Sequence, residues 1–308
     1  MTTTSPIAIG RALLVPALVL GLGLGAAGAP AGTALRWKYR AGEVWHYSMA
    51  QDTTMTTKVP ADMLDLKQAV RLIVDQTWTV KAVDPSGLAS LTQTVDRIRT
   101  SAELPTGRVT YDSSEAKDAS SPAGPLFKML VGAEFAFKMD PRGEISDIKL
   151  PEKMLATLRG GDEPAGAQGQ FSEAGLKNML AQMGILLPEG PVDVGGKWDR
   201  KMAVPGGADG QMRSIRQVYT YRGPDPRGAA ESIDLAIVFD APRPDPEIPV
   251  SIKSQESSGR IAFDNAAGRL SSSTVLMRVE SSGRVMGKEV AQTFATTTVM
   301  TLAGNPPR

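Results

Sequence analysis

The stretch that decides the fold is QTWTVK at residues 76–81, followed by DPSG at residues 84–87. Apolar and polar side chains alternate along the first six residues, which predicts a strand with one face on a core. In the next four, proline presets the first corner of a turn, aspartate caps backbone amides, and glycine takes a left-handed conformation. The segment therefore predicts a strand that ends in a hairpin turn.

The same elements recur in the second half of the chain. QVYTYR at residues 217–222 precedes DPRG at 225–228 with the same spacing. A glycine followed by tryptophan starts a strand upstream of each copy, at Trp45 and Trp198. An aromatic strand, a turn and a return strand follow downstream, from Phe137 in one copy and from Phe263 in the other. A period this long predicts a duplicated domain rather than a solenoid.

Further patterns complete the predicted architecture. DPRG at 140–143 and DNAAG at 264–268 give two more hairpin turns, so we interpret the turn aspartates as structural. We predict a mainly β (α+β) fold: two related halves of antiparallel, curved sheet, with a few short helices between and against them. The sequence leaves open whether the halves form one continuous sheet or two. The predicted segments are a first β-rich half at 35–150, a helical connector at 151–190 and a second β-rich half at 191–308.

Helical signals are confined to short stretches. Pro151 starts a predicted helix that ends at Arg159, before two glycines. Ser172 caps a second predicted helix over 173–183, in which apolar residues recur at helical spacing. A third is expected around 125–131.

The first 34 residues predict a secretory signal. Arg11 is the only charge before Arg36, an apolar run follows from Ala12 to Leu24, and small residues come next. We expect export to the periplasm or the cell surface. The run is shorter than the ~20 residues that span a bilayer, so we expect no transmembrane span after signal removal, although an uncleaved anchor remains the alternative. The GxGxxG pattern at 23–28 lies in this segment, not between a strand and a helix, and does not indicate dinucleotide binding.

Composition disfavours several kinds of chemistry. The chain has 34 basic and 33 acidic residues without long blocks of either sign, so it lacks the basic footprint of nucleic-acid binding. One histidine, His46, and no cysteine cannot build a usual zinc site. The GxSxG elbow of serine hydrolases and the phosphate-loop motif are absent. SEAK at 114–117 matches SxxK, but it lies in a polar loop without a companion KTG, and we interpret it as coincidence. We therefore expect no cofactor, no metal and no enzymatic activity.

The apolar residues of the chain are the remaining candidates for a functional site. The chain has 14 methionines, whose flexible side chains suit an adaptable apolar groove as well as ordinary core filling. A curved sheet closed by the helices at 151–159 and 172–183 would form a lipid-sized pocket. The candidate lining residues are Trp78, Phe137, Leu176, Met179, Met183, Tyr219 and Phe263.

Several stretches resemble an uncharacterised family of exported bacterial proteins, a domain of unknown function. They are LRWKY at 35–39 with GE at 42–43, QTWTV at 76–80, VGAEF at 131–135, PRGE at 141–144, FSE at 171–173, IKSQE at 252–256 and FDN at 263–265. The resemblance covers nearly the whole mature chain; it implies export and no known activity. At the level of fold, the chain is also similar to periplasmic lipoprotein carriers, whose sheet wraps an acyl chain under helices.

Three functions remain open. The first is a non-enzymatic envelope protein that binds an apolar ligand or lipid, or an envelope protein partner, through a β cradle. The second is a structural or assembly module that pairs with envelope proteins through strand edges. The third is a carboxylate-dependent hydrolase of envelope polymers, which requires two acids facing one cleft.

Overall fold

The structure is a computed structural model. It describes residues 32–59, 64–105, 107–115, 124–159, 173–205, 212–226, 228–239, 251–285 and 288–303. These residues belong to one compact unit, Gly32–Arg308. The predicted signal segment at 1–34 lies outside the described residues, apart from its last three positions. None of the described helices is long and apolar enough to cross a membrane.

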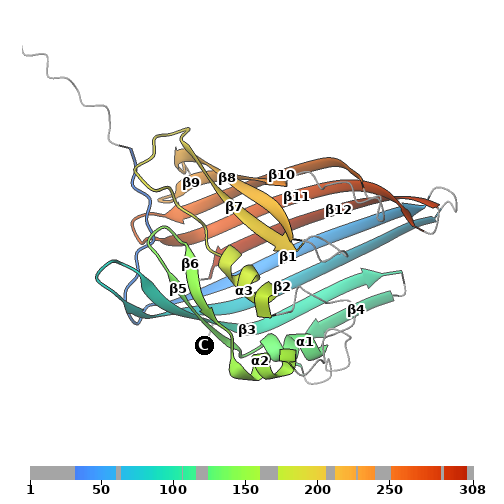
Figure 1. The fold of residues 1–308 in the computed structure, drawn as a ribbon, viewed down its shortest axis with the longest axis horizontal. Coiled ribbons are helices and arrows are strands. Elements are labelled where there is room, and N and C mark those ends of the chain that lie inside the picture. The colour runs from blue at the N-terminus through green and yellow to red at the C-terminus, as the bar shows by residue number, and fades with distance from the viewer. Residues whose placement is uncertain are drawn as a thin grey trace, which may run out of the picture. The chain divides into compact units, whose positions relative to one another are not determined.

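The described part of the chain is mainly β, with three short helices, which confirms the predicted fold class (Figure 1). The first six strands are β1 (Val44–Val59), β2 (Leu64–Val83), β3 (Ala89–Leu104), β4 (Gly107–Asp112), β5 (Glu134–Met139) and β6 (Ile145–Lys149). The other six are β7 (Lys197–Pro205), β8 (Met212–Pro224), β9 (Glu231–Phe239), β10 (Ser251–Asp264), β11 (Arg269–Val285) and β12 (Lys288–Leu302). The helices are α1 (Gly124–Leu130), α2 (Glu152–Arg159) and α3 (Glu173–Gln182), close to the predicted bounds.

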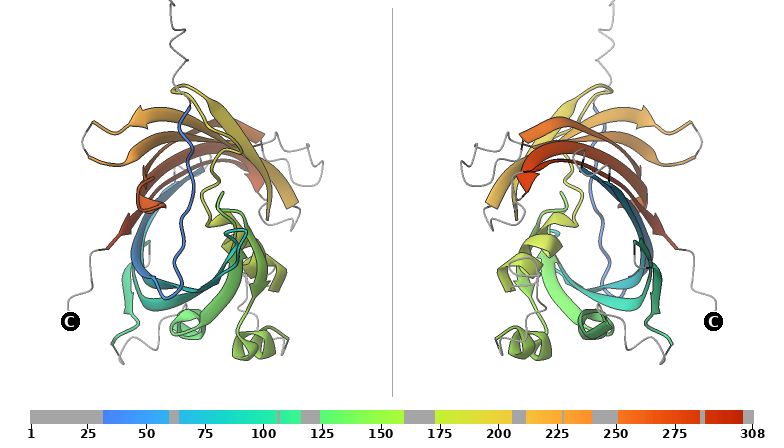
Figure 2. Two further views of the ribbon diagram at one scale, coloured as in Figure 1. Left: turned by 90° about the vertical axis from the view of Figure 1, so that its left-hand side faces the viewer. Right: turned by 90° about the vertical axis from the view of Figure 1, so that its right-hand side faces the viewer.

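The twelve strands form one sheet in the order β6-β5-β3-β2-β1-β12-β11-β10-β9-β8-β7, with β4 paired to β3 beside this path. The two halves meet where β1 pairs antiparallel with β12, from Tyr47 opposite Leu302 to Lys58 opposite Ala291. The sheet is strongly curved (Figure 2). Helix α3 contacts both β6 and β7, the strands at the two ends of the order. One continuous sheet therefore holds both predicted halves.

The aspartate turns are structural, as predicted. Asp84 Oδ1 accepts the backbone N–H of Ser86 at 2.8 Å and that of Leu88 at 3.1 Å. In the β5–β6 turn, Asp140 Oδ1 likewise accepts the backbone N–H of Arg142 at 2.9 Å and that of Glu144 at 2.8 Å. The glycines that close these turns have φ of +85° at position 87 and +92° at position 143. Each turn thus uses its aspartate as a cap and its glycine as the left-handed corner.

The two halves also match in hydrogen bonding at their strand starts. Gly42 N–H donates to Val80 O at 2.8 Å, and Gly195 N–H donates to Tyr221 O at 2.8 Å. Trp45 lies opposite Trp78 in the ladder, as Trp198 lies opposite Tyr219. The register shifts directly after Val80 and directly after Tyr221. The duplication stays a prediction, which this matched geometry supports.

Two hydrophobic clusters form the core. The first gathers the aromatic ends of the strands around the segment Leu35–Tyr39; Trp37, for example, packs edge-on against Phe263 at 5.4 Å between ring centroids. The second packs β3 and β5 against the helices, around Ile98 and Phe135. Met183, just after α3, packs against both clusters.

Burial of tyrosine hydroxyls predicts a stability limit at high pH. Burial raises the pKa of Tyr219 to about 12, and burial also raises the pKa of Tyr39 and Tyr47. The unfolded chain loses these protons near pH ~10. The neutral rings therefore stabilise the fold fully below that pH, and the contribution of Tyr219 is lost as pH rises from about 10 through about 12.

Urea unfolding at a series of pH values, with tyrosinate absorbance as a second signal, measures this dependence. The variant Tyr219→Phe should show a shallower loss above pH ~10. Stability that stays constant between neutral pH and pH ~12 would contradict the argument, because linkage requires a decrease wherever the folded pKa exceeds the unfolded one.

Candidate functional site

The two faces of the sheet differ in chemistry along the long strands. We define the inner face as the one that carries Trp45 and Tyr47, which are buried in the first cluster. Side chains alternate between the faces of a strand. Because the β1–β2 register has no bulge, the inner face continues along β1 through Met49, Gln51 and Thr53. Asp52 and the other even-numbered residues of β1 lie on the opposite, outer face.

Cross-strand pairing extends this face over four neighbouring strands. Met49 lies between Val74 on β2 and Met300 on β12. Two residues farther along β1, Gln51 lies between Leu72 and Thr298. We call the following set the inner-face array: Met49, Gln51, Thr53, Met55, Val70, Leu72, Val74, Val275, Met277, Val279, Phe294, Thr296, Thr298 and Met300.

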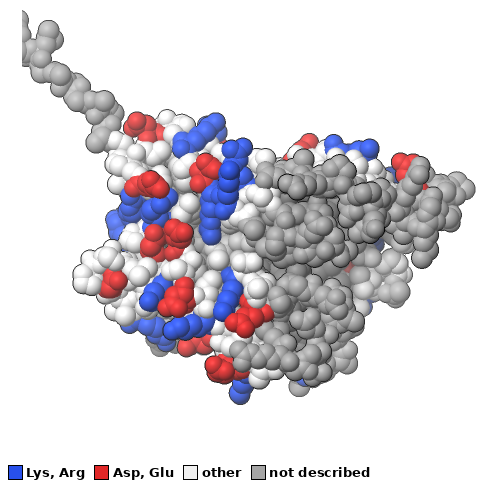
Figure 3. Space-filling view, in the orientation of Figure 1, with Lys and Arg blue, Asp and Glu red and all other residues white. Residues whose placement is uncertain are grey.

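The inner-face array contains no charged residue. Its members are half-buried, except Val70, which is 37% exposed. The outer face of β1 and β2 carries the ion pair Arg71–Asp52, at 3.4 Å, and Asp75 of β2 pairs there with Arg99 of the neighbouring strand β3, at 2.6 Å. Over the described surface in Figure 3, basic and acidic side chains are interspersed rather than separated by sign. The inner face therefore presents an uncharged, largely apolar surface, whereas the outer face is polar.

A short polar stripe runs along the middle of the array. Thr53 Oγ1 lies 3.2 Å from Thr296 Oγ1, and Gln51 Nε2 donates to each of these hydroxyls at 3.4 Å. Because these groups hydrogen-bond one another, they can face an apolar molecule at a lower desolvation cost than unpaired groups.

Toward the first cluster, the inner face carries buried polar atoms. Trp45, Trp78 and Gln93 lie opposite one another on β1, β2 and β3. The two indole N–H groups and Gln93 Oε1 are buried and have no hydrogen-bond partner among the described residues, while Gln93 Nε2 donates to Gln76 Oε1. Buried polar atoms are normally paired, so these three atoms are exceptions within the core.

The predicted pocket residues divide between the two clusters. Trp78, Phe137, Tyr219 and Phe263 are all buried in the first cluster, where Trp78 and Phe137 pack edge to face at 5.5 Å. Leu176 is buried in the second cluster and Met183 packs against both, whereas Met179 is 49% exposed. Their role in lining a ligand pocket stays a prediction.

The inner-face array includes residues that were not predicted as pocket lining. Met55, Met277 and Phe294 extend the face beyond the buried aromatic ends of the strands. The signal for them was present: period-two alternation continues along each strand past its aromatic residues, without a charge on the inner positions. The aromatic members of the predicted lining set lie in the filled core rather than on this more open surface.

Acidic and histidine side chains do not gather into a metal-binding group among the described residues. Within the described ranges, no group of three or more histidine, aspartate or glutamate residues could hold a metal ion. His46 lies half-buried on the outer face, with Nδ1 2.9 Å from Thr77 Oγ1. Thr77 Oγ1 in turn donates to Asp96 at 2.6 Å.

Comparisons with known proteins confirm the resemblance to a family of unknown function over part of the chain. Residues 86–223 match the model described as Family of unknown function (DUF6263). This stretch runs from the β2–β3 turn to the end of β8 and covers less than half of the chain. No curated protein matches the sequence.

Solved structures share only distant likeness with the chain. A structure described as lipid–protein interactions in lipovitellin has 10% identity and a TM-score of 0.48, covering 88% of this chain and 26% of that one. The chain thus spans about a quarter of that protein. DynF from the dynemicin biosynthesis pathway of Micromonospora chersina has 10% identity and a TM-score of 0.23, covering 96% of this chain and 94% of that one. A putative outer membrane lipoprotein-sorting protein domain from Vibrio parahaemolyticus has 7% identity and a TM-score of 0.16, covering 85% and 87%. These likenesses are too distant to indicate a function.

Proposed function

We propose that the protein is an exported, non-enzymatic carrier that binds one apolar or amphiphilic molecule, such as a lipid, on the inner face of its sheet. The observation that supports this most directly is the inner-face array: an uncharged surface across β2, β1, β12 and β11 that stays half-buried while the core fills elsewhere. Export rests on the predicted signal segment at 1–34.

The energetics of the array favour a ligand. Burying apolar surface is favourable by roughly 25 cal/mol for each Å² removed from water. A ligand that covers the array would gain this free energy. Contiguous apolar patches on one protein surface commonly mark binding sites. Met49, Met55, Met277 and Met300 contribute flexible side chains, which adapt to ligands of irregular shape.

The buried polar row gives the ligand a preferred direction. Trp45 and Trp78 each hold an unpaired indole N–H, and Gln93 holds an unpaired carbonyl oxygen, on the side of the array nearest the first cluster. The polar end of an amphiphile could pair with these groups once the core side chains that cover them move aside, while its chain lies over the methionines and valines. Orientation by a few polar groups in an otherwise apolar site is the usual pattern of small-molecule binding.

A direct binding test uses chain purified without detergent. Organic extraction followed by mass spectrometry should release acyl-chain lipids in near-stoichiometric amount. The delipidated chain should then enhance the fluorescence of the neutral probe N-phenyl-1-naphthylamine in a saturable way, and a lysophospholipid should displace the probe. Absence of extracted lipid together with a non-saturable probe response would exclude the carrier function.

A further inference from the structure

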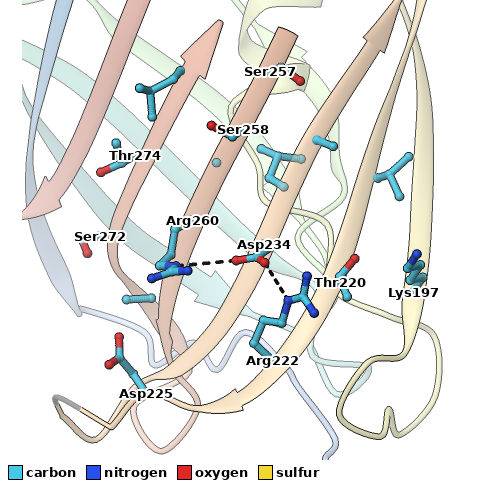
Figure 4. A pocket seen from close by; sticks show the side chains of 16 residues that line it. Lys197, Thr220, Arg222, Asp225, Asp234, Ser257, Ser258, Arg260, Ser272 and Thr274 are labelled. Atoms are coloured by element: carbon cyan, nitrogen blue, oxygen red, sulfur yellow. Dashed lines mark hydrogen bonds and ion pairs between the residues drawn. The ribbon is translucent and has the colours of Figure 1, made fainter.

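A second concave site lies on the outer face of the sheet, over β7 to β11. It is a hollow of about 770 Å³, within the size range of small-molecule sites. Figure 4 shows Lys197, Arg222 and Arg260 around it, with Asp234 between the two arginines. Its floor is made of small residues, including Ala236, Ser258, Gly259 and Ala262. Because these residues are small, the flanking long side chains stand above a depression.

One carboxylate holds both arginines. Arg222 Nε donates to Asp234 Oδ2 at 2.7 Å, and Arg260 Nε lies 3.6 Å from Asp234 Oδ1. The arginine side chains remain 54% and 60% exposed, against 30% for Asp234. Each guanidinium therefore faces the carboxylate with its Nε edge. In the described part of the chain, the Nη groups of both arginines have no hydrogen-bond or ion-pair partner.

Charge and hydroxyl groups complete the arrangement. The hollow is lined by three basic residues (Lys197, Arg222 and Arg260) and two acidic ones (Asp225 and Asp234), so three minus two leaves one positive charge in excess. Thr220, Ser258, Ser272 and Thr274 add hydroxyl groups to the lining. Guanidinium groups bind phosphate oxygens with paired N–H donors, and hydroxyls can serve the remaining oxygens.

We propose that this hollow binds a phosphate monoester or inorganic phosphate, with Arg222 and Arg260 as paired donors and Asp234 as the group that positions them. The phosphate could belong to a lipid headgroup or to a small soluble molecule, since both present the same oxyanion. The site is separate from the inner-face array because it lies on the opposite face of the sheet.

Calorimetric titration of the purified chain with inorganic phosphate, at constant ionic strength and against a chloride blank, tests the site. Arg222→Gln and Arg260→Gln should each weaken phosphate binding at least ~10-fold, since charge-assisted hydrogen bonds are the strong ones. Arg71→Gln is the matched control, because Arg71 is an exposed, ion-paired arginine on the same face and does not line the hollow. It should leave phosphate affinity unchanged. No heat of binding with the unmodified chain, or equal weakening in all three variants, overturns the proposal.

The variant Asp234→Asn tests whether phosphate binding depends on the positions of the two arginines or only on the positive charge of the hollow. Removing the carboxylate makes the hollow more positive, so nonspecific attraction would strengthen binding, whereas loss of positioning should weaken it. Weaker phosphate binding supports the proposal, and tighter binding overturns it.

Flotation with phosphatidylcholine vesicles, with and without phosphatidic acid, then identifies the source of the bound phosphate group. Binding dependent on phosphatidic acid indicates a lipid headgroup, whereas phosphate binding without flotation indicates a soluble ester.

Discussion

Replacing Gly143 with alanine should lower the free energy of unfolding by about 3 kcal/mol or more, from left-handed backbone strain and overpacking together. Gly143 has φ of +92° in the β5–β6 turn. A Cβ atom there would lie 2.2 Å from Ile185 O and 2.6 Å from Trp37 Nε1. The same two groups form a hydrogen bond of 3.1 Å, so the added methyl would displace both partners.

Gly42→Ala provides the control for this experiment. Gly42 has φ of +85°, and a Cβ atom there would meet nothing within 4 Å. Its substitution should cost only the conformational strain, roughly 1–2 kcal/mol. Urea unfolding of both variants measures the difference, which isolates the contact with the segment around Ile185. Equal losses in the two variants would show that this contact does not constrain the fold.

The close approach at Gly143 shows how the ends of the sheet are joined. A Cβ atom on Gly184 would lie 2.3 Å from Gly143 O, and Leu187 N–H donates to Arg142 O at 2.7 Å. The chain after α3 therefore packs backbone against backbone on the β5–β6 turn. On its other side, Trp198 Nε1 of β7 donates to Leu186 O at 2.7 Å. Residues 184–187 thus bridge the β6 and β7 ends of the sheet.

Local features of this arrangement could be predicted from the sequence, but the contacts between distant segments could not. DPRG at 140–143 predicts the turn and its left-handed glycine, because both depend on neighbouring residues. The contact of Gly143 with Ile185 depends on where a segment about forty residues later returns. The pairing of β1 with β12 is similar, since alternation identifies each strand but does not choose its neighbour.

In the candidate site, too, local features could be predicted from the sequence, whereas contacts between distant segments could not. In the sequence, Val70, Leu72 and Val74 continue the two-residue spacing that ends at Trp78, which predicts one shared face. The ladder confirms that these residues share a face. It could not show that Trp78 is buried whereas Val70 is 37% exposed, because exposure depends on which segments cover each end of the sheet. The Arg222–Asp234–Arg260 group had no local signature either, since its members come from three strands.

Introducing a glutamate at Met277 should weaken ligand binding by the inner face at least ~10-fold, whereas the same change at Leu276 should not. The two residues are consecutive on β11 and point to opposite faces. Met277 is half-buried within the inner-face array, opposite Thr296 on β12 and Ser257 on β10. Leu276 is 47% exposed on the outer face. An ionised carboxylate against an apolar ligand loses its hydration without gaining a partner, which is strongly unfavourable.

Titration with N-phenyl-1-naphthylamine measures the result. Met277→Glu should weaken probe binding at least ~10-fold, as a cost of about 1.4 kcal/mol already gives this factor, while Leu276→Glu should bind the probe like the unmodified chain. Met277→Gln, which is uncharged and similar in size, should fall between them and keeps the test valid if the glutamate variant folds poorly. Urea unfolding of each variant separates lost binding from lost structure. If the two glutamate variants bind the probe equally well, the ligand does not contact the inner face at β11, because the two positions are adjacent on the strand and point to opposite faces.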